Sequence, residues 1–140
     1  MSAKQLQTWC TGGSAEHNRD NYNYTQVIRV GDVLHLSGQG GWDVDKFEIP
    51  FDITEQIDRA FHNVEVQLTG AGSSGWGDVF RVNSYHISLS DEVQARMVYN
   101  FKKYMPDHKA TWTCVAVTRL GAERMAVEIE VQAYAPKVAA

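Results

Sequence analysis

The segment from Lys109 to Tyr134 constrains the fold more than any other part of this chain. It reads KATWTCVAVTRLGAERMAVEIEVQAY. Side chains alternate between two faces over 111–117, and they alternate again over 125–134 after a turn at 120–122. A period of two residues is typical of β-strands. We therefore predict two strands joined by a short turn, the second with an apolar face made of Val127, Ile129, Val131 and Ala133.

The faces of these two strands point to a functional site. Trp112, Cys114 and Ala116 share one face of the first strand, and Glu128 and Glu130 lie on the polar face of the second. If the apolar faces pack on the same core, Trp112, Cys114 and Glu128 lie together on the opposite side of the sheet. A thiol, an indole and a carboxylate on one face form either a solvated surface or the wall of a site.

Length and composition indicate one domain over residues 1–140, with a strand and a loop over 1–20. At 140 residues the chain can bury a core without disulfides. It has no apolar run of transmembrane length and no signal-peptide pattern, so we expect a cytoplasmic protein with no membrane partner. Cys10 and Cys114 are far apart in the sequence and should be reduced thiols. A net charge of -4, without a stripe of lysine and arginine, argues against a nucleic-acid partner.

The N-terminal part predicts a strand, a loop and a hairpin. Residues 6–10 are a candidate first strand, and the polar stretch 11–23, which lacks apolar periodicity, is predicted to be a loop. Strands are expected at 25–30 and 33–37. They are joined by a type II′ turn with Gly31 at its first central position.

A glycine-rich segment, Ser37-Gly38-Gln39-Gly40-Gly41, follows this hairpin. Glycines allow the backbone to approach a ligand or another chain closely. A flexible surface loop is the alternative interpretation. The sequence alone leaves both open.

Two amphipathic helices are predicted next, with a long strand at 79–89 between them. Asp52 is the expected N-cap of the first helix, and Gly70 is its expected C′ residue. Ser90 or Asp91 should cap the second helix.

The element order is therefore β-β-α-β-α-β-β, an α/β (α+β) fold with a mixed sheet. Helices between strands favour parallel pairing through crossovers, and hairpins add antiparallel edges. Two helices cover only one face of such a sheet. The other face, which would carry Trp112, Cys114 and Leu34 or His35, needs a cover, and a second copy of the chain is the simplest one. We therefore expect a homo-oligomer.

Few residues stand at the spacings that metal or nucleophile chemistry requires. The five histidines show no HxH, HExxH or HxxxH pattern, so neither a metal site nor a cofactor is expected. The segment from Gly70 to Gly75 follows a helix instead of opening one, which indicates a cap and a connecting loop. Cys114 is either a nucleophile or a small inert hydrophobe. Glu128 and Glu130 are either solvated carboxylates or include a base that activates water.

Several segments from about residue 21 onward resemble the RidA (YjgF-type) family of reactive-intermediate deaminases. They follow the family's order and spacing: Tyr24-Thr25-Gln26, Ser37-Gly38-Gln39, Gly70-Ala71-Gly72-Ser73, DVFRVN at 78–83, Met105-Pro106, Thr113-Cys114-Val115 and Val127-Glu128-Ile129-Glu130. The resemblance implies a chorismate-mutase-like fold and a homotrimer with a central β-barrel. Its ligand sites would lie in clefts between subunits. Deaminases of this family hydrolyse 2-imino or enamine acids to 2-oxo acids and ammonia.

The resemblance also implies roles for individual residues. Glu128 would position or activate the attacking water, and Cys114 would flank the ligand. The implied substrate-binding residues are Tyr24 at the cleft mouth, Ser37, Gly38, Gln39, Trp112 and Thr113. An iminium carbon is already electrophilic, so placing water beside it suffices without a covalent nucleophile.

Two positions depart from the deaminase pattern. The deaminases carry an arginine two residues before the cysteine, where it binds the substrate carboxylate, and this chain has Trp112 there. A polar helix residue expected at the cleft is also apolar, near Val98. A flat or apolar ligand that stacks on Trp112 therefore suits this chain better than an imine derived from an amino acid.

These observations lead to one expected function and two alternatives. We expect a small-molecule hydrolase that acts on an imine, an enamine or a related electrophile in clefts between subunits. The first alternative is a trimer of the same family that binds a metabolite without turnover. The second is the endoribonuclease activity attributed to part of the family, which the acidic charge balance argues against.

Overall fold

The two longest strands of the sheet lie side by side. The computed structural model describes residues 1–138, and in it β4 (Val79–His86) and β6 (Val127–Tyr134) pair antiparallel. The order across the six-stranded sheet is β1 (Thr8–Trp9), β2 (Val27–Val30), β3 (Val33–Leu36), β6, β4 and β5 (Thr111–Ala116). Only β4 and β5 pair in parallel, through the crossover that the alternation of strand and helix predicts. The sheet is therefore mixed, as expected.

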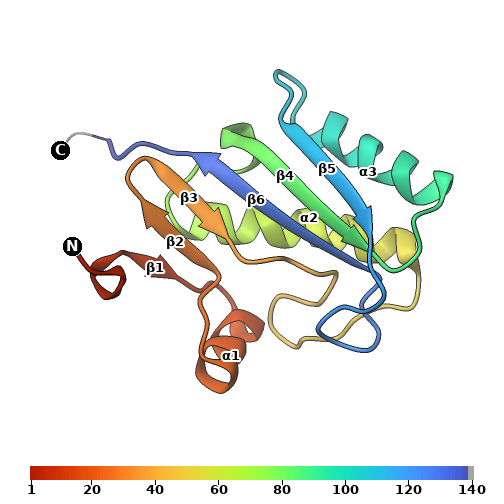
Figure 1. The fold of residues 1–140 in the computed structure, drawn as a ribbon, viewed down its shortest axis with the longest axis horizontal. Helices are drawn as coiled ribbons and strands as arrows, with labels where there is room; N and C mark the ends of the chain where they lie inside the picture. The colour runs from red at the N-terminus through yellow and green to blue at the C-terminus, as the bar shows by residue number, and fades with distance from the viewer. Residues whose placement is uncertain (139–140) are drawn as a thin grey trace.

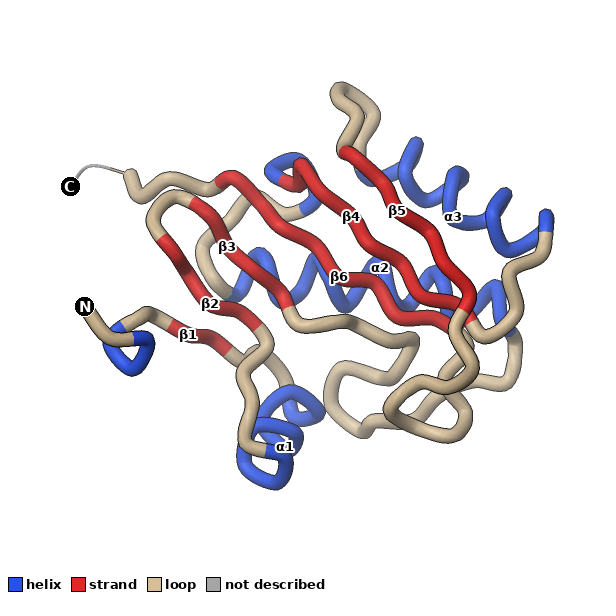
Figure 2. The backbone as a smooth tube through the Cα atoms, in the orientation of Figure 1, coloured by secondary structure: helices blue, strands red, loops and turns tan. Residues whose placement is uncertain are grey.

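Two long helices lie on one face of this sheet (Figure 1). They are α2 (Ile53–Gly70) and α3 (Asp91–Tyr104), and Asp52 and Ser90 cap them as predicted by accepting hydrogen bonds from backbone N–H groups of the first turn. Two short 3-10 turns, η1 (Ala3–Gln5) and η2 (Trp76–Asp78), are also present. Within residues 1–138, no helix lies on the opposite face of the sheet (Figure 2).

The core lies between the sheet and these two helices. All four residues of the predicted apolar face of β6 are at most 1% exposed. Phe61 of α2 stacks on Trp76 with ring centroids 4.7 Å apart, and Trp76 donates its indole N–H to the Phe61 carbonyl at 2.9 Å. Burial of these large rings stabilises the packing of α2 against η2 in this core.

The stretch predicted to be an N-terminal loop is a helix, α1 (Gly13–Tyr22). The helix is polar, so it lacks the apolar period by which such an element is recognised. It is held by hydrogen bonds to the 43–47 loop instead: the Ser14 N–H donates to the Val44 carbonyl at 2.9 Å, and the Ser14 hydroxyl donates to the Asp43 carbonyl at 2.7 Å. These contacts join segments far apart in sequence, which local patterns do not show.

The C-terminus of α2 lies two residues beyond its predicted position. Gly72, with φ of +91°, is the C′ residue, and Gly70 is still helical. The Ser73 N–H donates to the Leu68 carbonyl and the Gly72 N–H to the Thr69 carbonyl, both at 3.0 Å, which is the Schellman pattern. The interpretation of 70–75 as a cap and a connecting loop is confirmed.

The terminal strands β5 and β6 are both present, but they are not neighbours, because β4 lies between them. The pairing of β5 with β4 places Trp112 beside Val82 and Cys114 beside Ser84, on the helix-covered face. Glu128 lies beside Tyr85 on the other face. The prediction that Trp112, Cys114 and Glu128 share one face within a chain is therefore wrong.

The uncovered face is also composed differently from the prediction. Leu34 is fully buried under the helices, whereas its neighbour His35 lies on the uncovered face opposite Gln132. The large hydrophobic side chains exposed there are Val30, Val115 and Tyr134, at 49%, 39% and 57%. Polar residues of β4 and β6 occupy the centre of this face, namely Arg81, Asn83, Tyr85, Glu130 and Gln132.

Candidate active site

A cleft of about 630 Å³ lies at one end of the uncovered face, where β6 meets α1 and the loop after β3. Tyr24, Ser37, Gly38 and Glu128, which the sequence singled out, all line it. The other lining residues include His17, Asn18 and Tyr22 of α1, Trp42, Phe47, Met125 and Glu130. Residues from three segments distant in sequence are thus brought together, and α1 supplies a wall that the sequence did not predict.

The glycine-rich segment after β3 is packed closely against β6 and is not a free loop. The Gln39 N–H donates to the Ile129 carbonyl at 2.8 Å, and the Ile129 N–H donates back to Gln39 at 2.9 Å. A Cβ atom on Gly38 would collide with the carboxylate of Glu128. A glycine is therefore required at this position for the Glu128 side chain to lie in the cleft.

The two carboxylates of β6 have different surroundings. Glu130 accepts hydrogen bonds from the Tyr85 hydroxyl at 2.9 Å and from the Asn83 amide at 3.1 Å. The half-buried Glu128 carboxylate accepts none from the residues that the structure describes. Burial, followed by the charge of Glu130, raises the pKa of Glu128 above its ordinary value. Glu128 is therefore the carboxylate whose oxygens remain available to a water molecule or a ligand.

Ser37 and Gln39 have fixed roles in the cleft wall. The Ser37 hydroxyl donates to the Thr25 carbonyl at 2.8 Å, which ties the end of β3 to the segment that carries Tyr24. Gln39 is 1% exposed, and its amide donates to the Gln26 side chain at 2.6 Å. The Gln39 side chain thus supports the wall from behind and does not line the cleft.

Three residues expected at the site lie elsewhere in the same chain. Trp112 and Cys114 are on the helix-covered face, where the Trp112 indole N–H donates to the Ser84 hydroxyl at 2.9 Å. Thr113 is exposed on the uncovered face, two strands away from β6. None of the three lines the Glu128 cleft of its own chain.

Buried amides on α2, which the sequence did not single out, hold the loops around the cleft. Asn63, 1% exposed, donates to the Gly40 and Trp42 carbonyls, both at 2.8 Å. Gln56 donates to the Pro50 carbonyl at 2.8 Å and accepts from the Ala126 N–H at 2.8 Å, and Gln67 binds both backbone groups of Thr11. In the sequence, Gln56, Asn63 and Gln67 follow one another at intervals of seven and four residues, which places them on one helix face beside the apolar stripe. This spacing is the signal by which they can be recognised.

The described residues contain no group of three histidine, cysteine or acidic side chains that could hold a metal ion. Within residues 1–138, no helix combines the length and the apolar character needed to cross a bilayer.

A family model described as endoribonuclease L-PSP matches residues 17–135. The chain belongs to the RidA (YjgF) family. It is 30% identical over 119 residues to TdcF of Escherichia coli (strain K12), a match that spans 83% of this chain and 88% of TdcF. It is 28% identical over 115 residues to the 2-iminobutanoate/2-iminopropanoate deaminase of the same organism, spanning 80% of this chain and 85% of that one.

Solved structures of RidA-family proteins share the fold. The crystal structure of E. coli TdcF with bound serine superposes with a TM-score of 0.71 at 27% identity, covering 79% of this chain and 87% of that chain. The matched range 17–135 begins inside α1 and ends just after β6, so it contains both carboxylates and the glycine-rich segment. The sequence resemblance to this family is confirmed.

Proposed function

We propose that the cleft beside Glu128 hydrolyses the C=N bond of an imine, an enamine or a related electrophile, without a cofactor. The observation that carries the proposal is the state of Glu128, a half-buried carboxylate with a raised pKa and no hydrogen-bond donor among the described residues. A carboxylate that holds a water molecule and accepts its proton requires these properties. The relative named a 2-iminobutanoate/2-iminopropanoate deaminase supports the reaction class.

The proposed reaction proceeds in two steps. Ionised Glu128 accepts a proton from a water molecule as the water oxygen attacks the iminium carbon, which forms a carbinolamine. The resulting Glu128 carboxylic acid then returns the proton to the nitrogen. As the C–N bond breaks, Glu128 takes the proton of the carbinolamine hydroxyl, so that the carbon becomes a carbonyl, and passes this proton to the departing ammonia, which leaves as ammonium. Water is the only co-reactant, and the protein contributes its position and the proton transfer.

The charges around the cleft favour one kind of substrate. Its lining contains two carboxylates, Glu128 and Glu130, and no lysine or arginine. A protonated iminium is attracted to such a site, whereas a substrate carboxylate would lose water without gaining a paired cation. We infer that the substrate of this cleft carries its C=N bond on a neutral or cationic body.

We further propose that the protein is a cytoplasmic homotrimer whose subunits meet on the uncovered face of the sheet. That face exposes Val30, Val115 and Tyr134, and no helix covers it (Figure 2). β5 is an edge strand, so a second copy of the chain can approach along it. A neighbouring subunit that brings its Trp112, Thr113 and Cys114 to the Glu128 cleft would complete the site implied by the resemblance.

The test is the hydrolysis of benzophenone imine, an isolable N–H imine without a carboxylate, followed by ammonia release. The proposal predicts that wild-type protein accelerates release over buffer and that Glu128→Gln loses about a hundredfold or more of that acceleration. Glu123→Gln is the matched control, because Glu123 is exposed and lies outside the cleft. Saturable binding of the imine with release at the buffer rate would instead establish the binding-protein alternative.

A further inference from the structure

The Glu128 cleft contains a buried polar side chain whose hydrogen-bonding groups are unused. Asn18 of α1 lines this cleft and is only 4% exposed. Within residues 1–138, its side-chain amide forms no hydrogen bond. Each of the other buried side-chain amides in this part of the chain forms at least one, namely Gln26, Gln39, Gln56, Asn63, Gln67 and Asn100. Because buried amides are almost always paired, the Asn18 amide requires a partner that is not part of the chain.

The unpaired amide of Asn18 opens to the cleft. Among the described residues, the side-chain atoms that are both sealed from solvent and unpaired are Arg29 Nε, Asn63 Oδ1 and His86 Nδ1. Neither amide atom of Asn18 is one of them, so both belong to the small exposed part of the side chain. Since Asn18 lines the cleft, one donor nitrogen and one acceptor oxygen are available to a molecule bound there.

The docking of α1 fixes the position of Asn18. Ser14, about one helical turn earlier on the same face, accepts a hydrogen bond from the Phe47 N–H at 2.8 Å. The Gly13 N–H donates to the Asp45 carboxylate at 3.1 Å. A Cβ atom on Gly13 would collide with the Asp45 backbone, so the start of the helix lies directly against this loop. Asn18 is therefore held at the cleft without a hydrogen bond from its own side chain.

Two aromatic rings of the loop after β3 form an apolar wall of the same cleft. Trp42 and Phe47 both line the cleft, and their rings stack with centroids 5.0 Å apart and an angle of 22° between the planes. Phe47 has φ of +55°, a conformation that is unfavourable for a bulky side chain. With Ile49 and Met125 the two rings form a hydrophobic cluster separate from the main core. This cluster provides a surface on which the ring of a substrate can pack.

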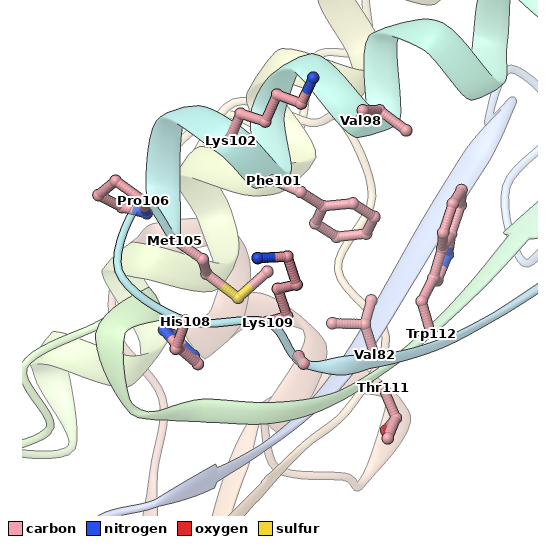
Figure 3. Close-up of a pocket in the computed structure, with 11 residues that line it drawn as sticks. Val82, Val98, Phe101, Lys102, Met105, Pro106, His108, Lys109, Thr111 and Trp112 are labelled. Carbon is pink, nitrogen blue, oxygen red and sulfur yellow. The ribbon is translucent and has the colours of Figure 1, made fainter.

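A further aromatic surface lies on the helix-covered side of the sheet, in a cavity between α3 and the start of β5 (Figure 3). The Phe101 and Trp112 rings meet there, with centroids 5.0 Å apart. The resemblance to the deaminases places Trp112 in the same inter-subunit cleft as Glu128, so this surface would belong to the same site. The Trp112 indole N–H already donates to the Ser84 hydroxyl at 2.9 Å, which leaves it no proton for Asn18.

We propose that Asn18 is a specificity-determining residue of the Glu128 cleft and that the substrate is an aromatic imine carrying a neutral carboxamide-like group. This inference rests on the hydrolysis proposed for the cleft and names the class of its substrate. The ring of the substrate packs on Trp42 and Phe47, and the Asn18 amide both donates to and accepts from the polar group. A carboxamide has a donor nitrogen and an acceptor oxygen, which match those of Asn18. A purely hydrocarbon body would leave the Asn18 amide buried and unpaired, which weakens binding.

Binding of stable ketones tests this assignment, because a ketone has the shape of the hydrolysis product and requires no turnover. The ligands are benzophenone, 3-benzoylbenzamide, 4-benzoylbenzamide and 4-benzoylbenzoate, each titrated into the full chain by calorimetry. We expect at least one benzoylbenzamide to bind about tenfold more tightly than benzophenone, the effect of two added hydrogen bonds. Equal or weaker binding of both amides, or no binding of any ketone, would contradict the proposal. Tighter binding of 4-benzoylbenzoate than of either amide would also contradict it, because a cation such as Lys109 of the cavity in Figure 3 would then govern recognition.

Substitution of two asparagines of α1 locates the effect. Asn18→Leu, which has nearly the same shape, should bind the preferred benzoylbenzamide about tenfold more weakly and should bind benzophenone as the wild-type protein does. It should also unfold at a higher temperature than the wild-type protein, because it removes a buried unpaired amide, whereas loss of a structural asparagine lowers this temperature. Asn21→Leu is the matched control and should leave both affinities unchanged. Asn21 is exposed, lies outside the cleft and already donates to the His17 carbonyl at 2.8 Å.

Binding and hydrolysis distinguish the two proposals for this cleft. If Asn18→Leu keeps the preference for the carboxamide, the role of Asn18 is wrong, even where the wild-type protein releases ammonia from benzophenone imine. If the preference is lost in Asn18→Leu and kept in Asn21→Leu, the role of Asn18 in recognition is supported, even where no imine is hydrolysed and the proposed reaction is wrong.

Discussion

At the scale of single residues, the function of a side chain in this chain depends on which face of the sheet it occupies. The strands that carry Trp112 and Glu128 both alternate cleanly in the sequence. Within its own strand, each of the two side chains lies on the face that the alternation predicts. Their relation depends on β4, which lies between them and places Trp112 under α3 and Glu128 on the uncovered face. A shift of one residue in the pairing of two strands moves every side chain of one strand to the other face of the sheet. The sequences of two strands therefore do not determine which of their side chains share a face.

Glu128 should make the stability of the protein depend on pH. Folding raises the pKa of Glu128 above its ordinary value of 4.5, chiefly through burial. Its protonated form is therefore favoured in the folded state, and the free energy of unfolding falls as the pH rises through the raised pKa. Glu128→Gln remains neutral at every pH. It should unfold at the same temperature as the wild-type protein at about pH 4, and at a higher temperature than the wild-type protein at about pH 8.

Thermal unfolding followed by circular dichroism at both pH values measures this effect. Glu123→Gln, at an exposed position, is the control and should differ from wild type equally at both. A Glu128→Gln protein that is less stable than wild type at the higher pH would show that the carboxylate stabilises the fold, contrary to the geometry.

At the scale of elements, the sequence predicts helices and strands well where an apolar period exists. The Asp52 and Ser90 caps, both long helices, the mixed sheet and the hairpin at Gly31 follow from local pattern. Gly31 has φ of +60°, and no positive φ is found at Asp32, as a type II′ turn requires. The polar α1 could not be predicted in this way, because its stabilising contacts are hydrogen bonds to a loop about thirty residues later in the chain.

The residues of the candidate site also divide into those that the sequence reveals and those that it does not. Tyr24, Ser37, Gly38 and Glu128 were found through a family resemblance, and the structure brings them to one cleft. The α1 wall and the amides of α2 were not found, because buried polar residues on a helix carry no sign of which loop they bind. Their role becomes clear only in the structure, where amides of α2 donate hydrogen bonds to backbone carbonyls of residues 40–50.

Asn63 should be the most sensitive of these amides. Asn63→Ala removes the donors of two hydrogen bonds to the Gly40 and Trp42 carbonyls, and it leaves a small cavity beside the glycine-rich segment. We expect a loss of about 1–3 kcal/mol in the free energy of unfolding. Urea denaturation measures it. His62→Ala, at the exposed neighbouring position of α2, should change the stability by less than about 0.5 kcal/mol, and equal effects at both positions would refute a specific role for Asn63.

At the scale of the whole molecule, one face of the sheet is covered by α2 and α3 and the other is free (Figure 1). We expect a trimer in sedimentation velocity at micromolar concentration. Val115→Glu should shift the protein towards monomer, because contact between subunits would bury an unpaired charge at a cost of several kcal/mol. Ala116, which shares its strand face with Trp112 and Cys114, is exposed on the helix side of β5 beside His86 and does not lie on the uncovered face.

His62→Glu, at an exposed position of α2, is the control for assembly and should sediment like wild type. A wild-type protein that sediments as a folded monomer would contradict the trimer. A trimer that tolerates Val115→Glu but is broken by His62→Glu would place the interface elsewhere.

The central claim is that the Glu128 cleft hydrolyses a C=N bond on a substrate without a carboxylate. The most direct measurement compares two imines with the same wild-type preparation. Ammonia release reports on benzophenone imine, and suppression of semicarbazone formation reports on 2-iminobutanoate generated by an amino-acid oxidase. The account predicts clear acceleration with benzophenone imine and no acceleration over buffer with 2-iminobutanoate, because no lysine or arginine lines the cleft. Strong suppression with 2-iminobutanoate, together with no activity on benzophenone imine, would contradict it.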